Sequence, residues 1–234
     1  MREKPSSREF DNYAQDYQDL LNDPIRERFA KNQIFFHQRK LEVLLDLLAQ
    51  DNVDPASQSW LDVGCGKGEL LEMGGPRFAL ASGCDPSPEM MNSTSRANLR
   101  LQEEPNRLPF ADASFDLVTA VCVYHHVVPN DRKALGDEIR RVLRPGGRFC
   151  IFEHNPWNPA TRIIVSRCPV DRNAVLLTRG ESISTLRQSG LTSLASRFFL
   201  FLPERVYRRV PAVERLLGGF PFGGQFAVLF RRAE

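Results

Sequence analysis

A glycine-rich loop that follows a short apolar strand constrains the fold of this chain more than any other feature. The segment reads Leu-Asp-Val-Gly-Cys-Gly-Lys-Gly at residues 61–68, directly after Trp60. Glycines at alternate positions let a backbone turn sharply at the end of a strand and approach a ligand closely. Such a loop is typical of the first strand–turn–helix unit of an open α/β sheet, where ligands bind at the carboxyl ends of the strands.

The sequence on either side of this loop alternates between strands and helices. We expect strands at residues 60–63, 78–83, 99–102, 115–123 and 148–153, and helices at 69–73, 88–98 and 131–143. The segment 115–123 is apolar nearly throughout, as expected for a strand that is covered on both faces. This alternation predicts a doubly wound, mostly parallel sheet.

The two ends of the chain follow other patterns. Residues 10–21 and 25–48 have apolar side chains at helical spacing, whereas 198–202 and 225–230 are expected strands around an arginine-rich helix at 204–217. We therefore predict one domain over residues 1–234. It divides into an N-terminal helical cap (1–58), an α/β core (59–153), and a lid with C-terminal elements on the substrate side (154–234).

The composition is that of an ordinary globular domain. Apolar residues make up 42% and charged residues 26%, which excludes disordered and collagen-like classes. Apolar runs of about five residues are far shorter than a membrane span. We expect no secretory signal, a cytoplasmic location and reduced cysteines. The five cysteines and four histidines form no metal-binding motif, so no metal site is expected.

The side chains of the glycine-rich loop favour one kind of ligand. A dinucleotide loop would have glycine where Glu69 stands, and no Ser or Thr completes a phosphate-binding loop. Asp62 at the head of the loop would repel a pyrophosphate but suits an amino group. Asp85, 21 residues after Gly64, stands where a carboxylate can accept two ribose hydroxyls. An amine, a ribose and no phosphate together describe S-adenosylmethionine (SAM).

Four segments carry a resemblance to a known family. They read Leu-Asp-Val-Gly-Cys-Gly-Lys-Gly (61–68), Gly-Cys-Asp-Pro-Ser-Pro-Glu-Met (83–90), Arg-Leu-Pro-Phe-Ala-Asp-Ala-Ser-Phe-Asp-Leu-Val (107–118) and Arg-Arg-Val-Leu-Arg-Pro-Gly-Gly (140–147). With them the chain resembles the class I SAM-dependent methyltransferases, in the small-molecule branch related to the ubiquinone/menaquinone-biosynthesis methyltransferases. The resemblance implies a Rossmann-like sheet of seven mostly parallel strands, the last antiparallel.

The resemblance also implies which residues would hold the cofactor. Asp62 would bind the methionine amino group, and Asp85 the ribose hydroxyls. Glu104, where the family more often has Asp followed by Ala, would bind the adenine amino group, and Val121 and Cys122 would pass close to the methyl-bearing sulfur. The remaining candidates are Gly64, Cys65, Gly66, Pro86, Met90, Pro105, Asn106 and, in the N-terminal helices, Tyr17.

Methyl transfer needs in-line positioning of nucleophile, methyl carbon and sulfur, and a general base only where the nucleophile must lose a proton. The candidate bases are His125 and His126 after the fourth strand and His154 after the fifth. The alternative for each is a structural role, paired with the backbone or a carboxylate. Because histidine bases are available, oxygen is favoured slightly over nitrogen or carbon as the methylated atom, with S-adenosylhomocysteine as the product.

Charge is distributed unevenly along the chain. Residues 1–139 carry 15 Lys and Arg against 23 Asp and Glu, whereas residues 140–234 carry 16 against 6. One interpretation is a solvated surface. The other is that the arginine-rich part faces an anionic or lipid-linked acceptor, with peripheral contact to a membrane.

Two other functions stay open at this stage. One is a protein that binds SAM or a nucleoside without catalysis, and the other is an NAD-dependent oxidoreductase, which the residue at Glu69 disfavours. Nucleic acid is not favoured as a partner, because the fourth strand ends in Val-Cys-Val-Tyr and no RNA-binding module is visible. We expect a small-molecule acceptor and leave the oligomeric state open.

Overall fold

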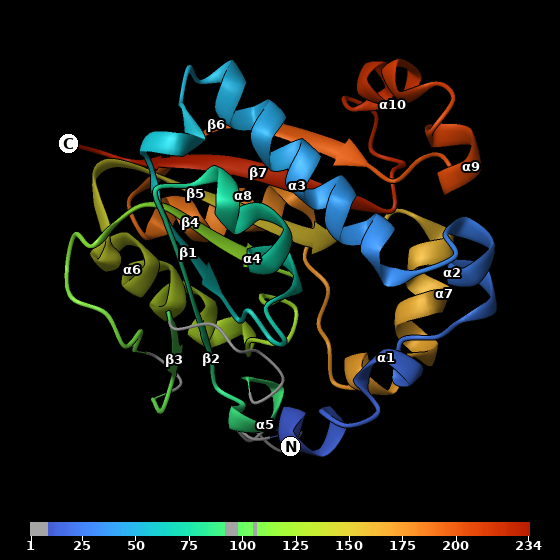
Figure 1. The fold of residues 1–234 in the computed structure, drawn as a ribbon, viewed down its shortest axis with the longest axis horizontal. Helices are drawn as coiled ribbons and strands as arrows, with labels where there is room; N and C mark the ends of the chain where they lie inside the picture. The colour runs from blue at the N-terminus through green and yellow to red at the C-terminus, as the bar shows by residue number, and fades with distance from the viewer. Residues whose placement is uncertain (1–8, 92–97, 105–106) are drawn as a thin grey trace.

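The computed structural model describes residues 9–91, 98–104 and 107–234. Within them, seven strands form one sheet in the order β3-β2-β1-β4-β5-β7-β6, with helices on both faces (Figure 1). The strands are β1 (Ser59–Val63), β2 (Leu80–Asp85), β3 (Leu99–Leu101), β4 (Phe115–Val121), β5 (Leu143–His154), β6 (Leu191–Phe199) and β7 (Gln225–Arg232). Strands β1 to β5 run parallel, and β7 lies antiparallel to both β5 and β6. The predicted fold class is confirmed.

The strand order reverses at β1, which lies between β2 and β4. The chain runs outward from β1 through β2 to β3 and then returns to the other side of β1 as β4. Loops at the carboxyl ends of β1 and β4 therefore leave the sheet in opposite directions, and a crevice opens between them. This is the position at which open α/β sheets bind ligands.

Side chains of each central strand alternate between two hydrophobic layers. Trp60 packs in the layer under α3 (Gln33–Gln50) and α4 (Glu69–Gly74), whereas its neighbour Leu61 packs in the opposite layer with α6 (Arg132–Val142) and α8 (Arg179–Gln188). Both side chains are fully buried. The central strands are thus covered on both faces, as the continuous apolar pattern of residues 115–123 predicted for β4.

The N-terminal helices differ from the prediction. Residues 9–29 form a 3₁₀ turn (Glu9–Tyr13), α1 (Tyr17–Leu20) and α2 (Pro24–Phe29), and the predicted helix at 25–48 is interrupted before α3. The interruptions have a local cause. The side chain of Asp23 accepts a hydrogen bond from Ile25 N, and that of Asn32 accepts one from Phe35 N, so each residue caps the start of a new helix.

The segment after β5 also contains helices that the periodicity did not predict. They are α7 (Pro159–Arg167) and α8, which begin at the capping residues Asn158 and Thr178. The single helix predicted at 204–217 was wrong, because it is divided into α9 (Glu204–Tyr207) and α10 (Pro211–Leu217). Helix α5 spans Pro88–Met91, and the rest of the helix predicted at 88–98 lies largely outside the described residues. None of the described helices is long and apolar enough to cross a membrane.

Glu214 on α10 fastens the C-terminal helices to the rest of the molecule. Its carboxylate is only 2% exposed and accepts a hydrogen bond from Arg39 Nη2 on α3 at 2.8 Å. It also accepts the backbone N–H groups of residues 200–202 at 3.1–3.2 Å. One buried acid thus joins α3, α10 and the segment after β6.

Replacing Glu214 with alanine is expected to lower the free energy of unfolding by about 3–5 kcal/mol, because Arg39 would keep only the half-exposed Glu42 as its counter-charge and three backbone N–H groups would lose their acceptor. Urea denaturation followed by circular dichroism measures the change. Asp137→Ala is the control. Its salt bridge to Lys133 is half exposed, and we expect its loss to change stability by at most about 1 kcal/mol. Equal effects of the two variants would contradict this role of Glu214.

Candidate functional site

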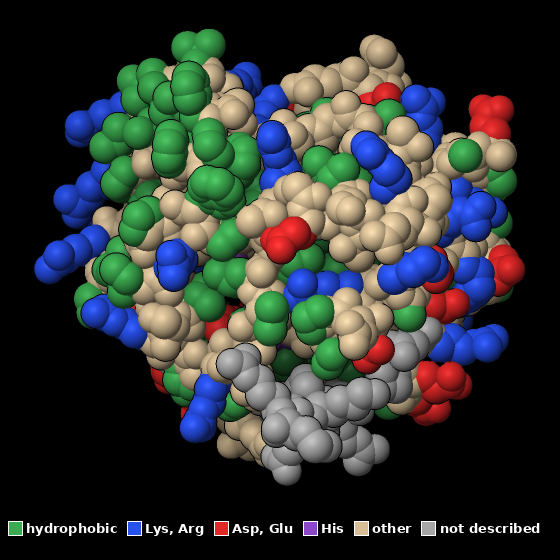
Figure 2. All heavy atoms as spheres, turned by 180° about the vertical axis from the view of Figure 1, so that it is seen from behind, with side chains coloured by type: hydrophobic (Ala, Val, Ile, Leu, Met, Phe, Trp, Pro, Cys, Tyr) green, Lys and Arg blue, Asp and Glu red, His purple; other side chains and the backbone are tan. Residues whose placement is uncertain are grey.

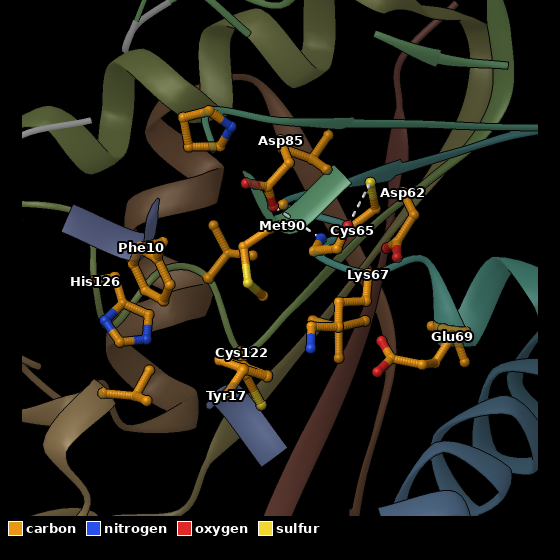
Figure 3. Close-up of a pocket in the computed structure, with 18 of the residues that line it drawn as sticks. Phe10, Tyr17, Asp62, Cys65, Lys67, Glu69, Asp85, Met90, Cys122 and His126 are labelled. Carbon is orange, nitrogen blue, oxygen red and sulfur yellow. Dashed lines mark hydrogen bonds between the residues drawn. The ribbon is translucent and has the colours of Figure 1, made fainter. Parts of the chain in front are cut away.

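A cavity of about 420 Å³ lies at the carboxyl ends of β1, β2 and β4 and is bordered by the N-terminal helices (Figure 3). Most of the cofactor-site residues proposed from the sequence line it together with one candidate base. They are Tyr17, Asp62, Gly64, Cys65, Gly66, Asp85, Pro86, Met90, Val121, Cys122 and His126. The topology therefore brings these distant segments into one site.

The glycine-rich loop forms the floor of the cavity through a backbone shape that needs glycine. Gly64 and Gly66 have φ angles of 69° and 52°, in the left-handed region. A Cβ atom on Gly64 would lie 2.5 Å from a methyl carbon of Val123. The N–H groups of Gly64 and Cys65 both donate to the carbonyl of Cys84, at 2.8 and 3.1 Å, which fastens the loop to β2.

Asp62 is held in the cavity wall by a chain of hydrogen bonds. Thr119 Oγ1 donates to Asp62 Oδ1 at 2.5 Å, and Trp60 Nε1 donates to Thr119 Oγ1 at 2.8 Å. The residue is 2% exposed. Burial raises the pKa of Asp62 from its ordinary 3.8 to about 7, although the bond from Thr119 opposes the rise. A ligand ammonium group would stabilise the charged form of this carboxylate.

Asp85 is oriented by backbone groups. Its Oδ2 accepts the N–H of Gly66 at 2.8 Å, and its Oδ1 accepts the N–H of Ser87 at 2.9 Å. Burial raises the pKa of Asp85, and these two hydrogen bonds oppose the rise. Each carboxylate oxygen keeps a further lone pair, so the fixed group has free acceptor capacity for a pair of hydroxyls, and its predicted role at the ribose stays a prediction.

The segment after β3 differs from the expected arrangement. Glu104 is exposed and does not line the cavity, while Pro105 and Asn106 lie outside the described residues. Instead Gln102, which directly follows β3, is buried and lines the cavity. Its N–H donates to the carbonyl of Asp85 at 2.9 Å. Gln102 was not predicted from the sequence, although a polar residue just after the third strand is in a position to line a ligand site.

The three candidate bases have different surroundings. His125 is 1% exposed, and its Nδ1 lies 2.6 Å from Glu153 Oε2. Burial opposes the charged imidazolium, but the charge of Glu153 and a hydrogen bond with Asp171 outweigh it and raise the pKa of His125 to about 10. This pairing matches the structural alternative considered for His125.

His126 lines the cavity, where its ring packs edge-on against Phe10. Burial and the charge of His125 lower the pKa of His126 to about 3, so its imidazole stays uncharged. His154 does not line the cavity, and its Nδ1 lies 3.4 Å from Gln225 Nε2. The structure thus brings one of the three candidate bases, His126, to the cavity surface.

Cys122 stands at the end of β4 in an unusual backbone conformation. Its φ is 58°, a region that a residue with a side chain rarely adopts, and such strain is frequent at functional sites. Gln225 Nε2 donates to its sulfur at 3.6 Å. Burial raises the pKa of the thiol, but the charges of Lys40 and His154 outweigh burial and lower it to about 7.

The basic residues that line the cavity come from the N-terminal half. Among the described residues they are Arg26, Lys40 and Lys67. The arginine-rich C-terminal part supplies none of them. Arg197 and Arg215 instead pair with Asp46 on α3, at 2.7 and 3.3 Å. The cavity lining therefore gives no support to an acceptor-binding role for Arg197 and Arg215, and the hypothesis that the arginine-rich part faces an anionic partner stays a prediction.

Comparison with known proteins identifies the domain. Residues 61–151 match a family model described as a methyltransferase domain. An uncharacterized methyltransferase of Bacillus subtilis, YcgJ, is 29% identical over 73% of this chain and 68% of its own length. A 27-O-demethylrifamycin SV methyltransferase of Amycolatopsis mediterranei is 33% identical, over 41% of this chain and 38% of its own length.

Solved structures share the fold over nearly the whole chain. A SAM-dependent methyltransferase of Thermotoga maritima, described as a possible histamine N-methyltransferase, superposes with a TM-score of 0.67. It is 16% identical and covers 95% of this chain and 98% of its own. A geranyl diphosphate C-methyltransferase of Streptomyces coelicolor, solved with Mg²⁺, geranyl diphosphate and S-adenosylhomocysteine, gives 0.62 at 18% identity and covers 92% and 88%.

The chain carries a methyltransferase domain over residues 61–151, and it shares its fold with SAM-dependent methyltransferases.

Asp62→Asn is expected to change the stability of the fold and the affinity for the cofactor in opposite directions. Because the pKa of Asp62 is higher in the folded state, ionisation destabilises the fold as the pH rises from about 4 to about 7. The variant lacks this penalty. At pH 8 and without SAM it should be more stable than the wild type, on the order of 1.4 kcal/mol for each unit of pKa shift, and at pH 4 the two should be similar.

The same variant should bind SAM at least about tenfold more weakly, because an amide carries no charge for the ammonium group. Thermal unfolding at both pH values and isothermal titration calorimetry provide the measurements. Asp51→Asn, which breaks a surface pair with Arg148, is the control and should leave SAM affinity unchanged. Unaltered SAM affinity in Asp62→Asn would contradict the assignment.

Proposed function

We propose that this enzyme methylates an oxygen of a small acceptor that carries an acidic group and is linked to a lipid. The observation that carries the proposal is that one cavity combines two buried carboxylates, Asp62 and Asp85, with two basic side chains, Arg26 and Lys40. The resemblance to quinone-biosynthesis enzymes stays a prediction and is not needed for the argument.

The cofactor would occupy the end of the cavity near the glycine-rich loop. Asp62 would bind the methionine amino group and Asp85 the ribose hydroxyls, while Val121 and Cys122 would border the sulfur. Bound SAM supplies an electrophilic methyl group, so the protein's contribution is to hold an acceptor oxygen in line with it. Such positioning can lower the barrier by roughly 7–11 kcal/mol.

Arg26 and Lys40 are the part of the site that points to an acidic acceptor. Arg26 stacks over Phe36 at 4.6 Å and hydrogen-bonds to Gln33 Oε1, and Lys40 is buried. Among the described residues, neither has a carboxylate within 4.0 Å. The carboxylate of bound SAM would pair with one of these two cations. The other cation would then be available to an acidic group on the acceptor.

A surface next to the site favours a lipid-linked acceptor. Figure 2 shows hydrophobic side chains gathered at its upper left, over α9 and α10, with Lys and Arg at their edge. We call this surface the apolar-basic face. Its exposed apolar residues are Val206, Val210, Val213, Leu216, Phe220 and Phe222, of which Leu216 is 80% exposed, and its exposed arginines are Arg205, Arg208, Arg209 and Arg215.

The apolar-basic face is connected to the carboxyl end of β5, on the side of the sheet where the cavity lies. Asn155, directly after β5, donates to the carbonyls of Pro221 and Gly223 at 2.9 and 2.8 Å, so the loop that carries Phe220 and Phe222 is fastened to the strand ends. The same loop leads into Gln225, which contacts Cys122. Exposed aromatic and basic side chains together suit the interface of an anionic membrane.

Arg26→Gln is expected to lower kcat/KM for acidic acceptors by about 10–100-fold, since charged hydrogen bonds contribute roughly 1.5–3 kcal/mol. Formation of S-adenosylhomocysteine is measured with pairs of hydroxyl acceptors that differ only in a carboxylate or phosphate. Turnover of the neutral member of each pair should change little. Arg187→Gln, at an exposed position on α8, is the surface control and should change neither. An equal loss on both members would contradict recognition of the acidic group.

The apolar-basic face is expected to bind vesicles of phosphatidylcholine that contain phosphatidylglycerol, and not vesicles of phosphatidylcholine alone. Vesicle sedimentation measures the bound fraction. Phe220→Ser combined with Phe222→Ser should abolish binding, because the aromatic side chains would no longer enter the interface. Leu80→Ser, which removes an exposed apolar side chain on β2, is the control. A chain that ignores anionic vesicles, or that buries this face in a dimer, would contradict the proposal.

A further inference from the structure

Two histidines and an aspartate converge beside the cavity at the end of β4. His125 Nε2 and His126 Nε2 each lie 3.4 Å from the same oxygen, Asp171 Oδ1. The three atoms all lie within 4.8 Å of one another. Asp171 belongs to the segment after α7, where it ends the 3₁₀ turn Pro169–Asp171. Its position opposite the two histidines therefore results from tertiary packing.

The spacing of these atoms also fits ligands of a shared ion. A hydrogen bond between an imidazolium and a carboxylate closes to about 2.7–2.9 Å. Nitrogen and oxygen ligands at about 2.0–2.2 Å from one tetrahedral ion lie about 3.4 Å apart. Both distances to Asp171 Oδ1 have this second value.

His125 is oriented as a metal ligand usually is. Its Nδ1 lies 2.6 Å from Glu153 Oε2, and a proton held between them leaves Nε2, which faces Asp171, as the nitrogen that would bind an ion in place of its own proton. Glu153 is fixed in turn, because its Oε1 accepts the N–H of Tyr124 at 2.8 Å. A carboxylate behind a ligating histidine sets its tautomer and ring orientation in many metal sites.

The charges around the cluster also call for a cation. Glu153 is fully buried and the Asp171 side chain nearly so. Within the described part of the chain, their ion-pair partners within 4.0 Å are the two histidines, and no Lys or Arg is among them. An imidazolium at His125 balances one of these two negative charges, whereas a divalent ion that displaces the Nε2 proton would neutralise both.

We propose that His125, His126 and Asp171 bind a divalent first-row transition metal ion, of which Zn²⁺ suits the tetrahedral spacing. Two imidazole nitrogens and one carboxylate oxygen are ligands that such ions accept, and they leave a fourth position open. This departs from the expectation of no metal site, because Asp171 is 45 residues from His126 and no sequence motif joins them.

The role of this metal ion in methyl transfer rests on the proposed function. His126 and Val170 line the cavity, so the open position faces the acceptor space. A hydroxyl bound there would lose its proton more readily, as metal-bound water does, with the proton passing to solvent water. The acceptor oxygen then forms the bond to the methyl carbon, and the electron pair of the carbon–sulfur bond stays on sulfur, which gives S-adenosylhomocysteine.

Metal binding is tested without SAM or acceptor, so that its failure is distinct from failure of methyl transfer. The purified chain is stripped with a chelator and titrated with Co²⁺, and absorbance in the visible range is recorded. We expect one equivalent to bind with the intense bands of a tetrahedral site. His126→Gln and Asp171→Asn should each weaken binding at least tenfold and reduce these bands.

His37→Gln, which removes another histidine of the cavity wall, is the matched control and should bind Co²⁺ as the wild type does. Calorimetric SAM binding by each variant shows that it is folded. Co²⁺ bound equally by the wild type and both cluster variants, or not bound at all by a chain that binds SAM, would overturn the site. Turnover by the chelated enzyme at the full rate would overturn its catalytic role.

Discussion

The site depends on carboxylates that are buried at strand ends before any ligand arrives. Asp62 is fixed by Thr119, and Asp85 by the N–H groups of Gly66 and Ser87. Burial raises the pKa of both acids, so the protein without cofactor carries an electrostatic cost. A bound cation would remove part of that cost. The oxygens are also already oriented, so they would accept a cation and a pair of hydroxyls without rearrangement.

The part of the cavity around the glycine-rich loop could be predicted from the sequence because it is local, whereas its role in binding the cofactor stays a prediction. One loop and two strand ends within residues 59–91 place Asp62 and Asp85, and parallel strands bring their carboxyl ends to one edge. The other half of the site could not be predicted. Arg26, Gln102 and Asp171 reach the cavity region only through the packing of the N-terminal helices, the segment after β3 and the segment after α7. No pattern along the chain encodes that packing.

The uneven distribution of charge has an explanation within the fold. Arginines of the C-terminal part pair with acids of the N-terminal part, as in the bonds of Arg148 to Asp51, Arg144 to Asp116 and Arg197 to Asp46. The two parts are therefore complementary to each other. An excess of arginines in a sequence therefore indicates an anionic ligand only where the fold leaves those arginines without an acidic partner. On the apolar-basic face, Arg205 and Arg209 have no ion pair among the described residues.

The difference between the two ends of the cavity explains why a methyl donor is easier to infer than an acceptor. SAM is the same molecule in every enzyme of the class, so its site can be built from one continuous segment with fixed chemistry. An acceptor must be enclosed by elements that vary, here α2, α3 and the segment around Asp171. Their side chains are selected by contacts across the molecule. The charge of the acceptor and the path of its proton therefore depend on the tertiary structure. The proposed metal site of His125, His126 and Asp171 is the part of that structure whose ion binding can be measured directly.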